Sequence, residues 1–262
     1  MNFKENRPLY LLQEIAAILR AEGGCAWDRE QTSSTLRPYL IEEAYELYEA
    51  IENNDTEHMK EELGDLIYQV YAHAQIASES GQFDIDDVAQ GIADKLVRRH
   101  PHVFGDAGEM TARQVSDNWE KIKKREKEHR ESLLDGVPSH LPALLRAYRV
   151  QQKVSRIGFD WERMDDVVAK IEEELCEFKE IALSGDRERI EEECGDILFS
   201  MVNALRFAHV NPEEALRKTT DKFITRFRIV EKLAAESGKG LEEMTIQEMD
   251  QLWELAKKQL KQ

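Results

Sequence analysis

The sequence predicts an all-α protein built from two tandem repeats of a helical bundle. Gly and Pro number only 13 and 6 among 262 residues, too few for the many turns of an all-β fold. Apolar residues recur at helical spacing rather than in strict alternation, as over 63–74 and 197–205. In addition, four sequence blocks of the first half recur in the same order in the second half, which indicates a duplication.

Turn and cap residues mark the helix ends in the first half. A turn is expected at Asn53-Asn54, ahead of a segment with helical spacing. Asp84 then precedes Ile85, with Asp87 three positions on. This order predicts an N-cap followed by an acidic first turn.

The second half carries signals of the same kind. Turns are expected at 184–186 and 237–238. Asn211, followed by Pro212 and Glu214, predicts a cap, a first-turn proline and a capping-box acid. Thr245 with Glu248 predicts another capping box, so roughly ten helices and no substantial sheet are expected overall.

Two acidic motifs open the repeated blocks. Residues 42–46, Glu-Glu-Ala-Tyr-Glu, resemble residues 173–177, Glu-Glu-Leu-Cys-Glu, and residues 61–65 resemble residues 192–196. The second motif follows the first by 19 residues in both halves. This equal spacing predicts the same helical arrangement in each half.

A basic block and an aromatic block follow in both halves. The matching residues are Lys95 and Lys222, Arg99 and Arg226, and Trp119 and Trp253. The lysine and arginine of each block lie one helical turn apart, so they share a face that could grip a polyphosphate. Each tryptophan could stack on a base or fill the core.

The domain boundary is expected in a charged and turn-rich stretch. A charged tract leads into a segment that contains Gly136 and Pro138. We therefore expect helical domains at 1–130 and 142–262, joined by a linker at 131–141.

The acidic motifs predict metal sites. Residues three apart lie on one face of a helix, so two such helices can bring four carboxylates together. Four converging anions repel one another unless protons or cations compensate them, and Mg²⁺ prefers hard oxygen ligands. The expected ligands are Glu43, Glu46, Glu62 and Asp65 in the first repeat, and Glu174, Glu177, Glu193 and Asp196 in the second. Gly64 and Gly195 lie beside these acids, which suggests a close approach of helices there.

The composition excludes several classes of function. A net charge of −17 and a pI near 4.9 repel nucleic-acid phosphate, so general nucleic-acid binding is not expected. No apolar run approaches the roughly 20 residues that span a bilayer, and Gln13 and Glu14 interrupt the only candidate signal peptide. The three cysteines show no CxxC spacing. We expect a cytoplasmic protein without membrane contact, disulfides or zinc.

These motifs, taken in order, resemble the all-α nucleoside triphosphate pyrophosphohydrolases of the MazG type. Residues 25–32, 98–104 and 158–161 also resemble landmarks of that family, and the similarity covers essentially the whole chain. The resemblance implies hydrolysis of ribo- and deoxynucleoside triphosphates between the α- and β-phosphates, giving a monophosphate and pyrophosphate. It further implies Mg²⁺, with Mn²⁺ as a substitute, and a homodimer. The implied metal ligands are the eight acids above, and the implied nucleotide contacts are Lys222, Arg226 and Trp253, with Lys95, Arg99 and Trp119 in the first repeat.

The two repeats are not expected to be equally active. Lys170 lies four residues before Glu174, and Arg189 lies four before Glu193. The matching positions in the first repeat hold Tyr39 and His58. Because histidine is ordinarily mostly neutral at pH 7, the second repeat has two more permanent cations for the phosphates, and we expect it to carry most of the activity.

Alternatives to this hypothesis come from three classes. A carboxylate di-iron bundle needs two Glu-x-x-His pairs, and the chain offers only Glu126 with His129, so this class is disfavoured. A pyrophosphohydrolase with a narrower substrate, of the dCTP/dUTP or phosphoribosyl-ATP kind, fits the same motifs. A non-enzymatic tandem helical scaffold would carry the acids as surface charge.

Overall fold

The protein is all-helical. The computed structural model describes residues 7–105, 108, 110, 111, 114, 115, 118, 119, 122 and 132–260, and these contain helices but no strand. The chain divides into two compact units, Met1–Glu128 and His129–Gln262, which we describe separately. The predicted boundary at 130–131 lies outside the described residues, and 132–141 of the predicted linker consist of turns, bends and irregular backbone.

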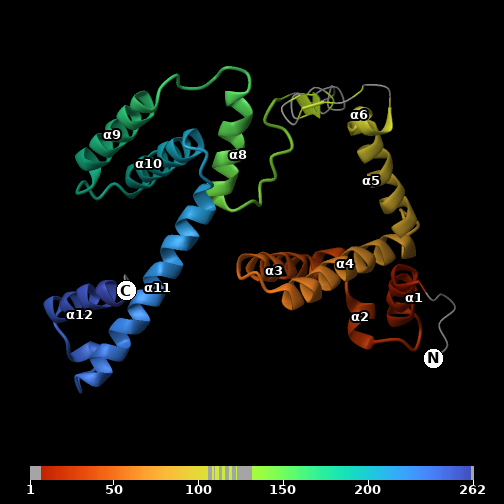
Figure 1. Ribbon diagram of the computed structural model, residues 1–262, viewed down its shortest axis with the longest axis horizontal. Helices are drawn as coiled ribbons and strands as arrows, with labels where there is room; N and C mark the ends of the chain where they lie inside the picture. Colours follow the sequence, from red (N-terminus) through yellow and green to blue (C-terminus); the bar gives the residue numbers. More distant parts are fainter. Residues whose placement is uncertain are drawn as a thin grey trace. The chain divides into compact units, whose positions relative to one another are not determined.

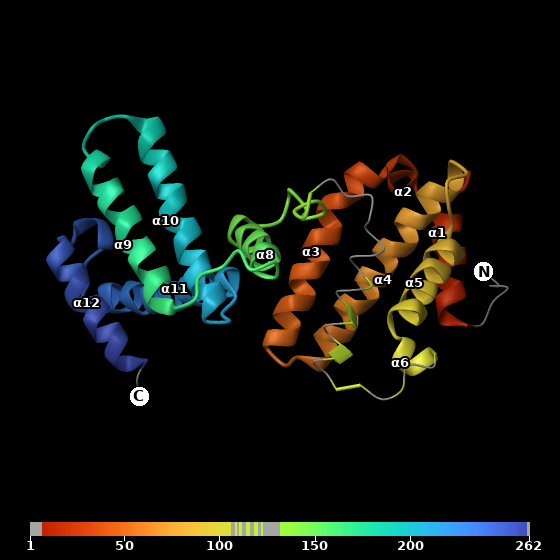
Figure 2. The same cartoon turned by 90° about the horizontal axis from the view of Figure 1, so that it is seen from above.

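The first unit is organised around a helical hairpin. Its helices are α1 (Pro8–Arg20), α2 (Ala26–Glu30), α3 (Ser33–Glu52), α4 (Thr56–Glu79), α5 (Ile85–Arg99) and α6 (Pro101–Phe104). Helices α3 and α4 pack side by side along their length, and α1 packs against α4 (Figures 1 and 2). Arg20 of α1 donates two hydrogen bonds of 2.8 Å to Glu79 of α4, which fixes this contact.

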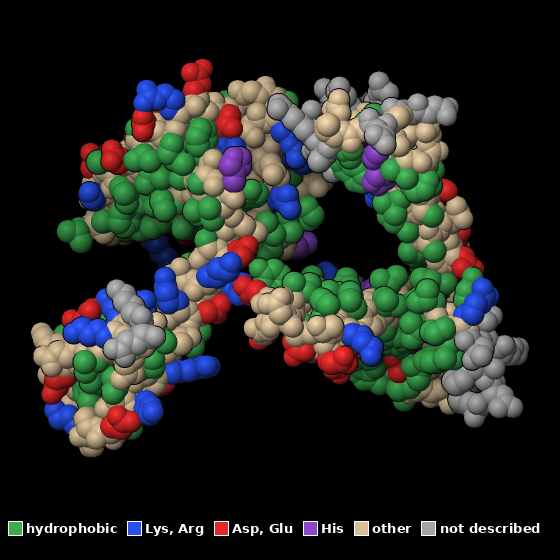
Figure 3. Space-filling model, viewed as in Figure 1, with side chains coloured by type: hydrophobic (Ala, Val, Ile, Leu, Met, Phe, Trp, Pro, Cys, Tyr) green, Lys and Arg blue, Asp and Glu red, His purple; other side chains and the backbone are tan. Residues whose placement is uncertain are grey.

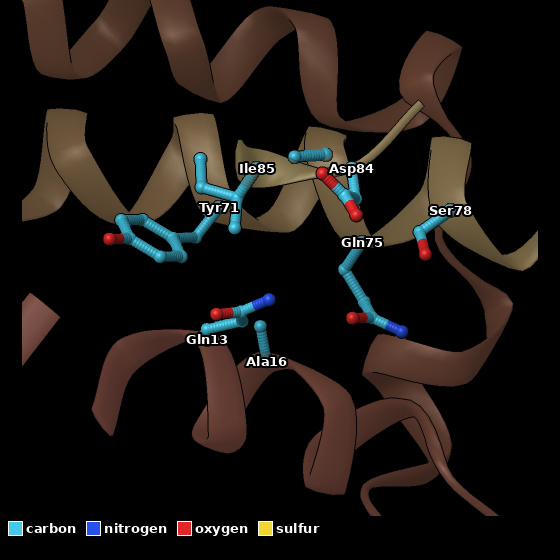
Figure 4. Close-up of a pocket in the computed structure, with 8 residues that line it drawn as sticks. Gln13, Ala16, Tyr71, Gln75, Ser78, Asp84 and Ile85 are labelled. Carbon is cyan, nitrogen blue, oxygen red and sulfur yellow. The ribbon is translucent and has the colours of Figure 1, made fainter. Parts of the chain in front are cut away.

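The contact of α1 with α4 leaves a cavity of about 20 Å³, the size of one water molecule. Gln13 and Ala16 of α1 face Tyr71, Gln75 and Ser78 of α4 across it (Figure 4). None of the predicted metal ligands of the first repeat lines this cavity. It therefore belongs to the packing of the unit rather than to the predicted site.

The second unit repeats the same order. Its helices are α8 (Ala143–Ser155), α9 (Met164–Ile181), α10 (Arg187–Phe207), α11 (Pro212–Glu236), the 3-10 turn η1 (Leu241–Glu243) and α12 (Ile246–Gln259). Helices α9 and α10 form the hairpin, α8 packs against α10, and α11 packs on α8 and α12 (Figures 1 and 2). Because α8, α9 and α10 reproduce the contacts of α1, α3 and α4, the predicted tandem repeat is confirmed.

The predicted caps lie at the observed helix starts. Asp84 and Asp87 form a reciprocal capping box at α5, as Thr245 and Glu248 do at α12. At α11, Asn211 accepts from two backbone amides and Pro212 occupies the first turn. These side chains satisfy amides that a helix start leaves without partners, which sets where each helix begins.

The buried residues are mostly small. Ala16, Ala50 and Ala74 pack in the first unit, and Val167 and Val202 in the second. Small side chains let the hairpin helices approach closely enough for facing acids to meet. Within the part of the chain that the structure describes, no helix is both long and apolar enough to cross a membrane.

Candidate metal centres and active site

The first carboxylate cluster lies on the α3–α4 hairpin. Glu43 comes from α3, and Glu62 and Asp65 come from α4. One oxygen from each of the three carboxylates lies within 4.8 Å of the others. The short connection between the helices, where Asp55 caps α4, makes the two acidic motifs face each other.

The second carboxylate cluster lies on the matching hairpin of the second unit. Glu174 and Glu177 of α9 meet Glu193 of α10, again with one oxygen each within 4.8 Å. Asp186 caps α10 as Asp55 caps α4. The acidic motifs that recur in the sequence therefore form one carboxylate cluster in each unit.

The fourth predicted ligand is Glu46 in the first set and Asp196 in the second. Neither has an oxygen within 4.8 Å of all the others, but the charge of each acts on a glutamate of its cluster. Partial burial raises the pKa of Glu43, and the charges of Asp65 and Glu46 raise it further. Partial burial likewise raises the pKa of Glu193, and the charges of Glu177 and Asp196 add to this. Glu46 and Asp196 therefore contribute to the negative potential of their sites.

Two buried carboxylate oxygens at matching positions have no hydrogen-bond partner among the described residues. They are Oε2 of Glu62 and Oε2 of Glu193. A buried anionic oxygen without a partner is costly, and a bound cation would compensate it. Because the donor sets contain only carboxylate oxygens, they fit Mg²⁺ or Mn²⁺ better than zinc.

The most buried glutamate of each cluster has a different basic neighbour, and the two glutamates, Glu62 and Glu174, are not at matching positions. His58 Nε2 lies 2.8 Å from Glu62 Oε1, whereas Lys170 Nζ lies 2.7 Å from Glu174 Oε1. Lys170 also donates to Glu173 at 2.7 Å, and these bonds raise the pKa of the Lys170 ammonium. The second site thus has a permanent cation at its edge, while Arg189 lies exposed in the first turn of α10.

A cavity of about 770 Å³ opens beside the second cluster. Glu174, Glu177 and Asp196 line it together with Lys170. Its other walls come from α8, α9, α10 and the segment between α8 and α9. They include Val150, Gln151, Val154, Phe159, Trp161, Val167, Phe199, Ser200, Asn203 and Arg206.

In both repeats the arginine of the basic block lies against the tryptophan of the aromatic block, a contact that the sequence analysis does not predict. The Arg99 guanidinium lies 5.2 Å from the Trp119 ring, and the Arg226 guanidinium lies 5.8 Å from the Trp253 ring. Trp253 also lies 5.0 Å from Phe223, in a second cavity of about 530 Å³ between α11 and α12. No residue of α11 or α12 lines the cavity beside the carboxylates.

Comparison with known proteins agrees with this arrangement. The MazG nucleotide pyrophosphohydrolase domain matches residues 31–104 and 163–230, so each match contains one carboxylate hairpin. The chain belongs to the MazG family. This confirms the resemblance drawn from the motifs.

Relatives match this MazG chain over most of its length. "Nucleoside triphosphate pyrophosphohydrolase/pyrophosphatase MazG" of Thermotoga maritima is 49% identical, covering 94% of this chain and 96% of its own. "Nucleoside triphosphate pyrophosphohydrolase" of Escherichia coli K12 is 42% identical, covering 95% and 96%. "Uncharacterized protein YabN" of Bacillus subtilis is 48% identical over 97% of this chain but only 53% of its own length.

The glycines beside the acids do not mark a close helix approach within this MazG chain. A Cβ added at Gly64 or Gly195 would meet no atom within 4 Å. The prediction of tight packing there is wrong within one chain, because both glycines lie on the exposed side of their helices.

Gly195→Ala is therefore expected to raise the free energy of unfolding by up to about 1 kcal/mol, because alanine favours the helix interior. Thermal melting of the metal-free protein measures this. A loss of stability that grows with protein concentration would contradict it and place a second copy against α10.

Sequence reasoning missed the cavity walls. Phe159 and Trp161 stand out in the sequence as aromatic residues ahead of the carboxylate helix, but nothing marks Gln151 or Asn203 as their neighbours. The sequence also gives no signal for the pairing of Arg206 with Asp160, because 46 residues separate them. The Glu126–His129 motif of the di-iron alternative lies outside the described residues.

Proposed function

We propose that this chain is a Mg²⁺-dependent nucleoside triphosphate pyrophosphohydrolase that accepts ribo- and deoxynucleotides broadly. The observation that carries this is the second carboxylate cluster, whose buried Glu193 Oε2 lacks a partner among the described residues, next to a cavity large enough for a nucleotide. The names of the relatives support the reaction class. The products are a nucleoside monophosphate and pyrophosphate.

The acids of each repeat would hold the metal. These are Glu174, Glu177, Glu193 and Asp196 in the second repeat, and Glu43, Glu46, Glu62 and Asp65 in the first. When bound, Mg²⁺ would supply the positive charge that stabilises the departing pyrophosphate. A carboxylate oxygen of the cluster accepts the proton of the attacking water.

The basic residues bind the phosphates in this proposal. Lys170 can exchange its bond to exposed Glu173 for a phosphate oxygen without leaving Glu174. Arg189, Lys222 and Arg226 would add positive charge, and Trp253 would contact the nucleotide from the separate cavity between α11 and α12. Lys95, Arg99 and Trp119 have the same roles in the first repeat.

A homodimer fits the exposed apolar surface of the hairpins. Leu198 and Met201 of α10 are 56% and 43% exposed, and the matching Ile67 and Val70 of α4 are 39% and 44% exposed. Figure 3 shows hydrophobic side chains gathered over α9 and α10. Apolar patches of this kind mark contact surfaces, and a second copy would cover the same face of each protomer.

The three cysteines are free, which fits the reducing cytoplasm.

Product analysis tests the reaction. Incubation with each nucleoside triphosphate and Mg²⁺ is expected to give monophosphate and pyrophosphate, and a chelator is expected to stop the reaction. Chromatography that shows diphosphate and orthophosphate would overturn the proposal. Activity with a single pyrimidine deoxynucleotide or with phosphoribosyl-ATP alone would favour the narrower alternative. A melting temperature unaffected by Mg²⁺ and nucleotide would favour the scaffold.

A further inference from the structure

The segment between α8 and α9 forms one wall of the cavity beside the second carboxylate cluster. Residues 158–161 all line this cavity, which Glu174, Glu177 and Asp196 line as well. Under the proposed function the substrate occupies this cavity. The position of the segment therefore decides the shape of the site.

Packing contributes little to holding this segment in place. Ile157 is 67% exposed and Phe159 is 77% exposed. Their backbone amides both donate to the backbone oxygen of Val154, near the end of α8, at 3.2 Å. These bonds fix the segment to the helix that precedes it, but they do not reach the helices that carry the acids.

An ion pair joins the segment to α10. Arg206 Nη1 donates to Asp160 Oδ2 at 2.9 Å, and Nη2 donates to Asp160 Oδ1. The Arg206 side chain is only 10% exposed, and that of Asp160 is 26% exposed. Asn203 Oδ1 accepts from Arg206 Nη2 at 2.7 Å, and Asp160 Oδ1 accepts from the Trp161 amide at 2.9 Å. A bidentate pair with such supporting bonds holds both side chains in one geometry.

The first unit holds the corresponding segment with a different arginine. Gln75 stands at the position that matches Arg206 in the duplicated sequence. Instead, Arg20 of α1 donates to the backbone oxygen of Gln31 at 3.0 Å, while its other nitrogens bind Glu79. Both units thus fix the segment ahead of the carboxylate hairpin, with arginines from different helices. This points to a requirement of the site rather than to a by-product of duplication.

We propose that Arg206 is a positioning residue of the second site, which acts through Asp160 to hold residues 158–161 as a preformed wall of the substrate cavity. The inference rests on the proposed function, since it takes the cavity to receive the nucleotide. Binding to a wall that is already ordered avoids the cost of ordering its side chains. The guanidinium is engaged with Asp160 and Asn203 and has no direct role on the phosphates.

Arg206→Met and Asp160→Ala in the full chain test this role. The KM for ATP with Mg²⁺ is expected to rise about tenfold in each variant, because binding must then order the segment. The kcat is expected to stay within about twofold, since the wall contacts the substrate alike in ground state and transition state. The double variant is expected to match the single variants, because each substitution removes the same pair.

Arg163→Met is the matched control. It removes an exposed ion pair with Asp165 from the same segment, and Arg163 does not line the cavity. Its KM is expected to equal that of the wild type. A KM that rises only in Arg206→Met would make Arg206 a direct phosphate contact and overturn the positioning role. A double variant with a much higher KM than either single variant, or wild-type KM values throughout, would overturn it as well.

Hydrogen exchange of the backbone amides of residues 157–161 measures the order of the segment without turnover. Exchange is expected to be about tenfold faster in both variants, while the amides around the carboxylates on α9 and α10 stay protected. If the wild type releases no pyrophosphate but exchange still quickens in both variants, the proposed function fails and the positioning of the segment by Arg206 stands. Unchanged exchange would exclude that positioning.

Melting curves verify that each variant is folded at the assay temperature. Should Arg206→Met fail to fold, Asp160→Ala carries the test, because it breaks the same pair from the exposed segment. A wild-type KM in folded Asp160→Ala would again overturn the proposal.

Discussion

Glu193→Gln is expected to abolish Mg²⁺-dependent pyrophosphate release while leaving the metal-free protein as stable as the wild type or more stable. Loss of partners outside the ligand shell already costs about 10–100-fold in metal affinity or activity, so loss of a ligand oxygen is expected to cost at least about 100-fold in kcat. The fold does not suffer, because the carboxylate makes repulsive contacts with Glu177, Asp196 and Glu174. Pyrophosphate release and thermal melting measure the two effects.

The gain in stability has a defined pH dependence. Partial burial and neighbouring acids raise the folded-state pKa of Glu193 above its usual 4.5, so folding favours its protonated form. The stability that this carboxyl contributes is present below pH 4.5 and is lost as pH rises through the raised pKa. Glutamine stays neutral, so the advantage of the variant is expected at neutral pH and disappears on acidification.

Glu192→Gln is the matched control for this prediction. Glu192 is the exposed neighbour of Glu193 and lies outside the cluster. Its replacement is expected to leave activity near normal. A large loss of metal-free stability in Glu193→Gln would contradict the repulsive cluster and indicate a structural hydrogen bond to this side chain.

The pair Glu62→Ala and Glu193→Ala is expected to separate the two repeats, with activity lost only in the second variant. The second cluster borders the large cavity and has Lys170 at its edge, whereas the first has His58 at the buried glutamate. Charge-assisted contacts to phosphate are worth about 1.5–3 kcal/mol each, so Lys170 and Arg189 together would separate the repeats by a few orders of magnitude.

Pyrophosphate release at saturating Mg²⁺ measures the difference between the two variants. Equal partial losses would mean that both repeats work. Loss only in Glu62→Ala would assign the activity to the first repeat. Loss in neither variant would exclude both carboxylate clusters from the reaction.

The sequence by itself determined the helical fold, its duplication and the residues that form the carboxylate clusters. These features are local: caps such as Asp84 and Thr245 act within one turn, and acids three residues apart share a face whatever surrounds them. The equal spacing of the acidic motifs in the two repeats also predicts that Glu62 meets Glu43 and that Glu193 meets Glu174, as the structure shows. The family followed from the order of these motifs.

Only the tertiary structure decided which acids lie closest together and which side chains and cavities lie next to them. It left Gly64 and Gly195 facing open space, and it placed Trp253 on a separate cavity, with the Arg226 guanidinium 5.8 Å from its ring. The cavity beside the second cluster depends on side chains from α8, α10 and the α8–α9 connection, which meet only after the hairpin packs. Such contacts join residues far apart in the chain, as Arg206 joins Asp160, and no local pattern encodes them.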